Sequence, residues 1–279
     1  MTHVKKATAW APGNISCIFQ ICRGKGPSTI GSRGLGFTVN RGAKVTLSEA
    51  KSTAVFYNKK KIIIPTVLLV IKKLTKKNIS VKISSELPLG VGFGMSGASA
   101  LATSYALNKL LRLGKGKKEL AMAAHCAEVE AGTGLGDVVN QFYGGLLVKL
   151  EPSWRFEVMR PRAAQWEVYC RQYGRISTKS IISNPRKEKK INGAAQEPLE
   201  KLGAMLIAGK TLSFQDIISL SKEFAVKSGL LGDRRVKAAI KSIEKRGGHA
   251  SMIMLGNAVF ADIPFPGSIK LRMSKAGAQ

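Results

Sequence analysis

The chain has 279 residues and a formal net charge of +28, with 45 Lys and Arg against 17 Asp and Glu. Its 44% of apolar residues is enough to build the core of one large domain or two moderate ones. No apolar run approaches the roughly 20 residues of a membrane span. The four cysteines lack metal-binding or redox spacing. We therefore expect a cytoplasmic protein without a membrane segment, in a reducing compartment.

The first 50 residues predict strands joined by glycine-containing turns. Residues 7–16 are typical of a short strand that enters a Pro-Gly turn. Residues 31–36 are expected to form a loop, followed by strands at 37–40 and 43–47. Arg33, the one arginine of this loop, is a candidate clamp for a substrate carboxylate because guanidinium pairs with it in a fork geometry. A flexible hairpin with a solvated Arg33 is an equal alternative.

A glycine loop between a strand and a helix is the main sequence signal. Residues 79–84 alternate apolar and polar side chains, which predicts a half-buried strand. A Ser- and Ala-rich helix is expected to begin after Met95 and run to about Arg112. The free N–H groups at the N-terminus of such a helix attract phosphate. The residues predicted to bind the phosphates of a nucleotide are Pro88, Gly90, Gly92, Gly94, Met95, Ser96, Gly97, Ala98 and Ser99.

Two carboxylates follow this loop along the chain. Residues 117–130 predict a second helix, with Glu128 at the border of its apolar stripe. A second glycine loop at residues 132–136 then leads to Asp137. Such a pair suits phosphoryl transfer, because one carboxylate can bind Mg²⁺ and the other can accept a hydroxyl proton. The alternative is structural, with Asp137 capping a turn and Glu128 solvated.

The glycine loop resembles the phosphate loop of the GHMP kinases (galactokinase, homoserine, mevalonate and phosphomevalonate kinases). Ser96 falls on the second serine of their motif, which helps to hold Mg²⁺ on ATP, and Met95 replaces the first. The resemblance implies ATP and Mg²⁺ as cofactors, Ser96 and Glu128 as metal ligands, and Asp137 as the catalytic base. Glu130 is the second candidate for the metal.

Residues 11–15, 31–36 and 133–138 together resemble one branch of that family, the archaeal pantoate kinases. This resemblance implies transfer of the ATP γ-phosphoryl group to the 4-hydroxyl of (R)-pantoate, a step of coenzyme A biosynthesis. It also makes Thr178, in a Ser-Thr-Lys segment, a candidate substrate contact. His125 is either a contact to substrate or phosphate or a packed helix residue. Another GHMP kinase activity, of the mevalonate or homoserine type, is the alternative within the enzyme class.

The second half of the chain predicts strands at 154–159 and 166–170, a polar turn at 176–183 and a solvated charged link at 187–192. Helices are expected at about 197–208, 214–227 and 234–245, with Ser213 and Asp233 as N-caps. Residues 247–261 predict a hairpin that turns at Gly256 and Asn257. It occupies the place of the third GHMP motif, of which only residues 247–248 remain.

The family resemblance implies an α+β fold of two domains. Residues 1–151 would form a ribosomal S5 domain 2-like domain, and residues 152–279 a ferredoxin-like domain that closes the cleft. The lysines occur in short runs with few aromatic residues between them, so we favour a solvated surface over a nucleic-acid face. The positive field would also attract ATP. The expected partners are thus pantoate and ATP; the sequence leaves a homodimer open, and a basic nucleic-acid-binding protein is the alternative from another class.

Overall fold

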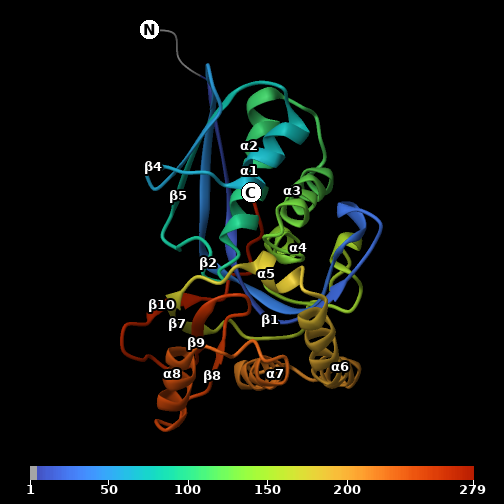
Figure 1. Ribbon diagram of the computed structural model, residues 1–279, viewed down its shortest axis with the longest axis vertical. Coiled ribbons are helices and arrows are strands. Elements are labelled where there is room, and N and C mark those ends of the chain that lie inside the picture. Colours follow the sequence, from blue (N-terminus) through green and yellow to red (C-terminus); the bar gives the residue numbers. More distant parts are fainter. Residues whose placement is uncertain (1–4) are drawn as a thin grey trace.

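Two β-sheets organise the chain (Figure 1). The computed structural model describes residues 5–279, so residues 1–4 of the predicted first domain lie outside the described part. The first sheet has the order β1-β2-β5-β3-β4, with β6 paired to β2, and the second has the order β10-β7-β9-β8. The strands of the first sheet are β1 (Lys6–Cys22), β2 (Gly31–Glu49), β3 (Ala54–Tyr57), β4 (Lys60–Lys61), β5 (Ile79–Ser85) and β6 (Leu146–Lys149). Those of the second are β7 (Glu167–Gly174), β8 (Ala250–Met252), β9 (Asn257–Ala261) and β10 (Ile269–Arg272). The two sheets therefore come from the two halves of the sequence, whereas the predicted domain boundary itself stays a prediction.

Helices cover one face of the first sheet. They are α1 (Pro65–Leu74), α2 (Met95–Leu111), α3 (Lys117–Ala131) and α4 (Asp137–Tyr143). The strands alternate to match: Val45 and Leu47 of β2 are fully buried beneath the helices, while Lys44 between two buried neighbours is exposed. Helix α2 is buried on almost all sides because its Gly, Ala and Ser residues let neighbouring elements approach closely.

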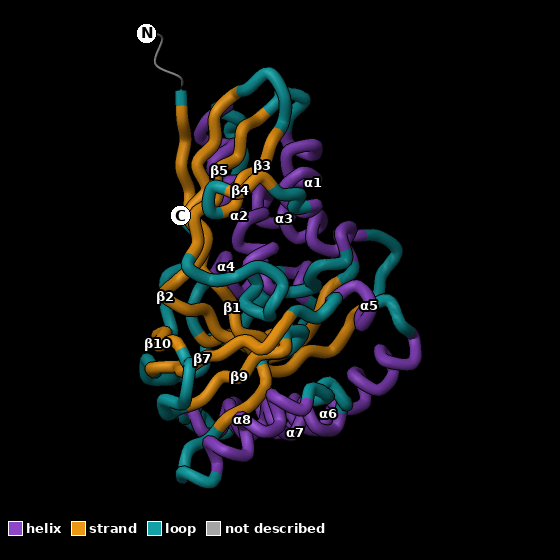
Figure 2. The backbone as a smooth tube through the Cα atoms, turned by 60° about the vertical axis from the view of Figure 1, so that its left-hand side comes forward, coloured by secondary structure: helices purple, strands orange, loops and turns teal. Residues whose placement is uncertain are grey.

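Four helices lie between β7 and β8 along the chain: α5 (Thr178–Ile182), α6 (Pro185–Ile207), α7 (Phe214–Lys227) and α8 (Arg234–Glu244). Figure 2 shows α6, α7 and α8 below this sheet. The predicted N-caps are confirmed, since Ser213 accepts a hydrogen bond from the N–H of Asp216 and Asp233 accepts one from that of Arg235. The bounds predicted for α7 are those of the structure.

Several predictions of local structure were wrong. The Pro-Gly turn expected after the first strand lies inside β1, which continues to Cys22 with a register shift between Pro12 and Gly13. The polar turn expected at 176–183 contains the short helix α5, and the helix expected at about 197–208 begins at Pro185. Residues 31–36 belong to β2 rather than to a loop, because they pair with the end of β1. Residues 154–159 form no continuous strand: Phe156 is left-handed at φ 56°, which interrupts an extended chain, and only Met159 makes an isolated bridge. The charged segment 187–192 lies inside α6, which Asn184 caps and whose Ile191 packs into the core.

The turn of the β8–β9 hairpin packs against the phosphate loop. Strand β9 begins at Asn257, so the turn lies at residues 253–256, slightly earlier than predicted. A Cβ atom on Gly256 would lie 2.2 Å from the carbonyl oxygen of Val91, and one on Gly92 would lie 2.8 Å from Cγ2 of Ile253. Only glycine fits at this contact. The second half of the chain thus reaches the phosphate loop through this turn.

Candidate active site

The loop between β5 and α2 lines a pocket that Glu128 and Asp137 also line. Gly90, Gly92 and Gly94 have φ values of 76°, 97° and 63°, which favour glycine. The helical ladder of α2 starts with the bond from the N–H of Ala98 to the carbonyl of Gly94, 3.0 Å long. The N–H groups of residues 95–97 therefore lie outside the ladder, where they can bind an anion.

Residues from both halves of the chain line this pocket. Ser96 stands at the start of α2, and its Oγ lies 2.9 Å from the Oγ1 of Thr66. Glu128 and Asp137 form part of the wall, and Met254, from the hairpin turn of the second half, completes it. The pocket therefore brings together the loop and both carboxylates that the sequence singled out.

Glu128 is buried at the end of α3, with 1% of its surface exposed. Neither of its carboxylate oxygens has a hydrogen-bond partner within residues 5–279. Its Oε2 lies 2.9 Å from the position of a Cβ on Gly97 and 2.7 Å from that of a Cβ on Gly134. These two glycines make room for the carboxylate between the phosphate loop and the second glycine loop. Burial, together with the nearby charge of Asp137, raises the pKa of Glu128 well above its usual range.

Asp137 is the first residue of α4 and is held by two side chains of β1. Its Oδ1 accepts hydrogen bonds from the Nδ2 of Asn14 at 2.8 Å and from the Oγ of Ser16 at 2.9 Å. Its Oδ2 lies 3.3 Å from where a Cβ on Gly94 would stand. Burial raises the pKa of Asp137, although its hydrogen bonds and a nearby lysine act in the opposite direction. One oxygen is thus fixed, and the other faces the phosphate loop.

The nearby lysine is Lys149, which the sequence reasoning missed. It ends β6 with 4% of its surface exposed, and its Nζ donates to the Oδ1 of Asn140 at 2.5 Å. Burial lowers the pKa of Lys149 to about 8, against the opposing effect of Asp137. A lysine at the end of an otherwise apolar strand was the available signal. Asn14 and Ser16 were also missed; they follow Pro12 and Gly13, which the sequence analysis assigned to a turn and which the structure places within β1.

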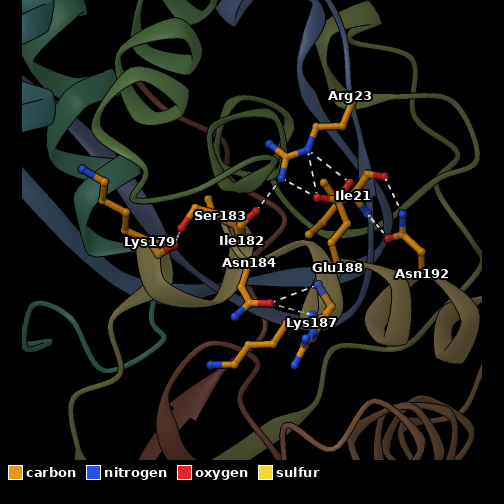
Figure 3. Close-up of polar contacts among 10 residues, drawn as sticks. Ile21, Arg23, Lys179, Ile182, Ser183, Asn184, Lys187, Glu188 and Asn192 are labelled. Carbon is orange, nitrogen blue, oxygen red and sulfur yellow. Dashed lines mark hydrogen bonds and ion pairs between the residues drawn. The ribbon is translucent and has the colours of Figure 1, made fainter.

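Thr178 lines the pocket from the first position of α5. Figure 3 shows how the chain around α5 is tied to the end of β1. The guanidinium of Arg23 donates to the carbonyl of Ile182 and to Glu188. The side-chain amide of Asn192 accepts from the N–H of Ile21 at 2.8 Å and donates to its carbonyl at 3.0 Å, as a neighbouring strand would. The bond to Ile182 thus holds the end of α5 to the chain after β1, and the bonds of Glu188 and Asn192 hold α6 there.

The structure places Arg33 and His125 outside the residues that line the pocket. Arg33 lies opposite Gln20 in the β1–β2 ladder, while its neighbour Ser32 faces the pocket. His125 is fully buried, and its Nε2 lies 2.9 Å from the carbonyl oxygen of Ile30. Burial lowers the pKa of His125 to about 4, so the ring is neutral near pH 7. These positions do not support the predicted substrate contacts, and that of His125 matches the packed-helix alternative.

Two further findings concern metal ligands and membrane segments. No group of three or more His, Cys, Asp and Glu side chains that could hold a metal occurs within the described part of the chain. A metal at this pocket would therefore need oxygen ligands from a bound molecule as well. No helix among residues 5–279 is both long and apolar enough to cross a membrane.

Comparisons with known proteins agree with this geometry. Residues 61–145 match the family described as GHMP kinases N terminal domain. The pantoate kinase of Methanocaldococcus jannaschii is 35% identical, with 90% of each chain covered. The pantoate kinase of Methanospirillum hungatei is 30% identical, covering 93% of this chain and 88% of its own. A solved structure titled "Phosphotransferase related to CoA biosynthesis pathway" superimposes with a TM-score of 0.83 at 24% identity over 98% of both chains, which shows a shared fold.

The fold and the site define an ATP-dependent small-molecule kinase with the GHMP architecture. Within that class, the extent of identity with the two curated relatives is decisive. The chain belongs to the pantoate kinase family.

Proposed function

We propose that this chain transfers the γ-phosphoryl group of ATP to the 4-hydroxyl of (R)-pantoate, giving 4-phosphopantoate for coenzyme A biosynthesis. The two relatives named pantoate kinase, similar over about nine tenths of the chain, support the choice of substrate. The observation that carries the proposal is the convergence of the phosphate loop, Asp137 and Lys149 on one pocket. The four unpaired cysteines are in keeping with a cytoplasmic enzyme.

In this mechanism Asp137 is the base. Asn14 and Ser16 hold its Oδ1, so Oδ2 is left to accept the proton of the 4-hydroxyl as the hydroxyl oxygen attacks the γ-phosphorus. The bond from the γ-phosphorus to the bridging oxygen breaks, and ADP leaves. A raised pKa brings a carboxylate nearer to the working pH and strengthens it as a base. The N–H groups at the start of α2 bind the phosphates and fix the line of attack. Positioning and charge stabilisation of this kind dominate catalysis of phosphoryl transfer.

Lys149 is the candidate partner for the pantoate carboxylate. It lies in the pocket with Asp137 and Thr178, and it is buried, so its charge is poorly screened. A carboxylate bound there would be placed on the same side of the pocket as the base. Thr178 offers a hydroxyl at the rim for a second hydrogen bond.

The residues present fit a magnesium ion. The two unpartnered oxygens of Glu128 among the described residues and the hydroxyl of Ser96 are the hard oxygen ligands that Mg²⁺ prefers. Glu128 and Ser96 would hold the ion together with the phosphates of ATP. When bound, it neutralises charge on the β- and γ-phosphates.

The test is ATP consumption over a panel of pantoate, mevalonate, phosphomevalonate and homoserine, with the product identified by mass spectrometry. Pantoate should give the highest kcat/KM, and Asp137→Asn should lower kcat at least about a hundredfold without unfolding the protein. Asp262→Asn is the matched control, because Asp262 pairs with His249 away from the pocket. Faster turnover of mevalonate or homoserine would assign the chain a different substrate.

A further inference from the structure

The face of the first sheet opposite the helices is open. Helices α1 to α4 lie on one side of the sheet, and in Figure 1 they stand to its right while its left side has no other element over it within residues 5–279. Figure 2 shows the same strands in front of the helices. Side chains on this face, such as Thr8, Lys44 and Lys82, are accordingly exposed.

The pairing register brings residues from separate strands into three rows on this face. The first row is Lys6, Ser48, Ser80 and Ala54; the second is Thr8, Thr46, Lys82, Phe56 and Lys61; the third is Trp10, Lys44 and Ser84. The rows thus contain four lysines, five hydroxyl side chains and two aromatic rings. The hydroxyls of Thr8 and Thr46 lie 3.0 Å apart, which shows that neighbouring positions interact across the strands.

The rows contain no carboxylate. The nearest acidic residues lie at the ends of the strands, and each is already paired: Glu49 with Lys77 at 2.8 Å and Glu86 with Arg41 at 3.0 Å. The lysines of the face are therefore available to an anionic partner. A shallow groove runs between β2, β3 and β5, with Lys44, Phe56, Lys59 and Lys82 along it.

The two aromatic residues stand at opposite sides of the basic area. Trp10 lies on β1 and Phe56 on β3, and β2 and β5 separate them. Three strand spacings across the sheet and a two-residue offset along the strands place them about 16 Å apart. Both rings are only partly buried, so part of each remains accessible. Lys44 and Lys82 lie between them on the intervening strands.

We propose that this open face binds single-stranded nucleic acid. Exposed rings on a sheet can stack with bases, and lysines and hydroxyls between them can contact the phosphates and sugars. A flat sheet lacks the protruding helix or ribbon that enters the major groove of a duplex. The sequence suggested dispersed, solvated lysines because these residues are far apart along the chain, whereas the register collects them. The proposal is independent of the kinase reaction, since no residue of the three rows lines the pocket.

The experiment measures binding of a fluorescein-labelled 15-nucleotide oligo(U) by anisotropy, with excess ATP present to occupy the phosphate loop. The triple variant Lys44→Gln, Lys61→Gln and Lys82→Gln should reduce the slope of log K against log salt by about 2. Trp10→Leu and Phe56→Leu keep apolar bulk but remove the ring, and each should weaken binding roughly tenfold. All variants should keep parental kinase activity and melting temperature.

The matched control replaces two exposed lysines of α8 and the exposed lysine that follows its last residue: Lys237→Gln, Lys241→Gln and Lys245→Gln. It changes the net charge equally and should leave the affinity nearly unchanged. Equal weakening by both triple variants would overturn the proposal in favour of diffuse charge attraction. So would tighter binding of a duplex of the same length, binding to phosphatidylglycerol vesicles but not to oligo(U), or a dimer in sedimentation that the face variants dissociate.

Discussion

Glu128 is expected to destabilise the folded chain whenever no cation lies beside it. Its two buried oxygens have no hydrogen-bond partner in the described structure, and each such group costs roughly 1–3 kcal/mol. Glu128→Met replaces the carboxylate with an apolar side chain of similar length, at some cost in fit. The free energy of unfolding without nucleotide or divalent cation should therefore rise by about 2 kcal/mol. For a chain of this size that corresponds to a melting temperature about 4–8 °C higher.

The assay combines calorimetric melting in EDTA with steady-state kinetics in Mg²⁺ and ATP. Glu128→Met should melt higher than the parent and lose at least about a hundredfold in kcat. Glu128→Gln keeps the shape and some of the polarity, so its melting temperature should fall between the two. Glu130→Gln is the control: Glu130 is exposed and pairs with Lys73, so both properties should stay near the parental values.

Two results would refute this reasoning. A lower melting temperature for Glu128→Met would show that the carboxylate stabilises the fold through partners that the geometry does not contain. Near-parental kcat in Glu128→Met would remove Glu128 from the reaction. Loss of activity in Glu130→Gln as well would point to the second candidate for the metal.

Three further predictions concern the pocket and its supports. Because the pKa of Lys149 is lowered to about 8, its charge is lost as the pH rises through that value, so kcat/KM for pantoate should fall above pH 8. Lys149→Arg should shift this alkaline fall to higher pH, and an unchanged pH profile would contradict the assignment. Burial lowers the pKa of His125 in the folded chain to about 4, whereas in the unfolded chain it stays near 6.5. As the pH falls below about 6.5, His125 is therefore protonated in the unfolded chain but not in the folded one, which favours unfolding. The stability advantage of the parent over His125→Leu in urea titrations should therefore shrink by up to about 3 kcal/mol between pH 7 and pH 4, and a constant difference would refute the shift. Asn192→Leu removes both bonds that hold α6, the helix directly after α5, to Ile21 of β1. If this anchor positions Thr178 through α5, KM for pantoate should rise about fivefold with little change in kcat, and a change confined to kcat would rule that positioning out.

The local signals of the sequence were sufficient where one stretch of chain forms one feature. The strand before the phosphate loop, the glycine loop and α2 follow one another directly, and their residue types determine the local conformation. Helix α7 was predicted with its correct bounds because Ser213 and Asp216 form a capping box before an amphipathic run. The meeting of Glu128 and Asp137 was predictable because only the second glycine loop separates them.

Features that depend on register or on distant contacts were not predictable in the same way. Lys149 reaches the pocket because β6 pairs with β2, and no local pattern specifies that pairing. Residues 31–36 look like a glycine loop until the end of β1 pairs with them. The charged residues 187–192 predicted a solvated link, but Ile191 and the alanines at 194 and 195 form the buried apolar stripe of α6.

The contact of Gly256 with the backbone at Val91 and Gly92 has an evolutionary consequence. Substitutions in the two halves of the chain are not independent at this point, because a Cβ atom on either glycine has no room unless the facing backbone moves away. A chimaera that joins the first half of this chain to the second half of a relative should assemble a working pocket only if the donor also keeps a glycine at the hairpin. Substitutions at these two positions would then be expected to occur together in related sequences rather than independently.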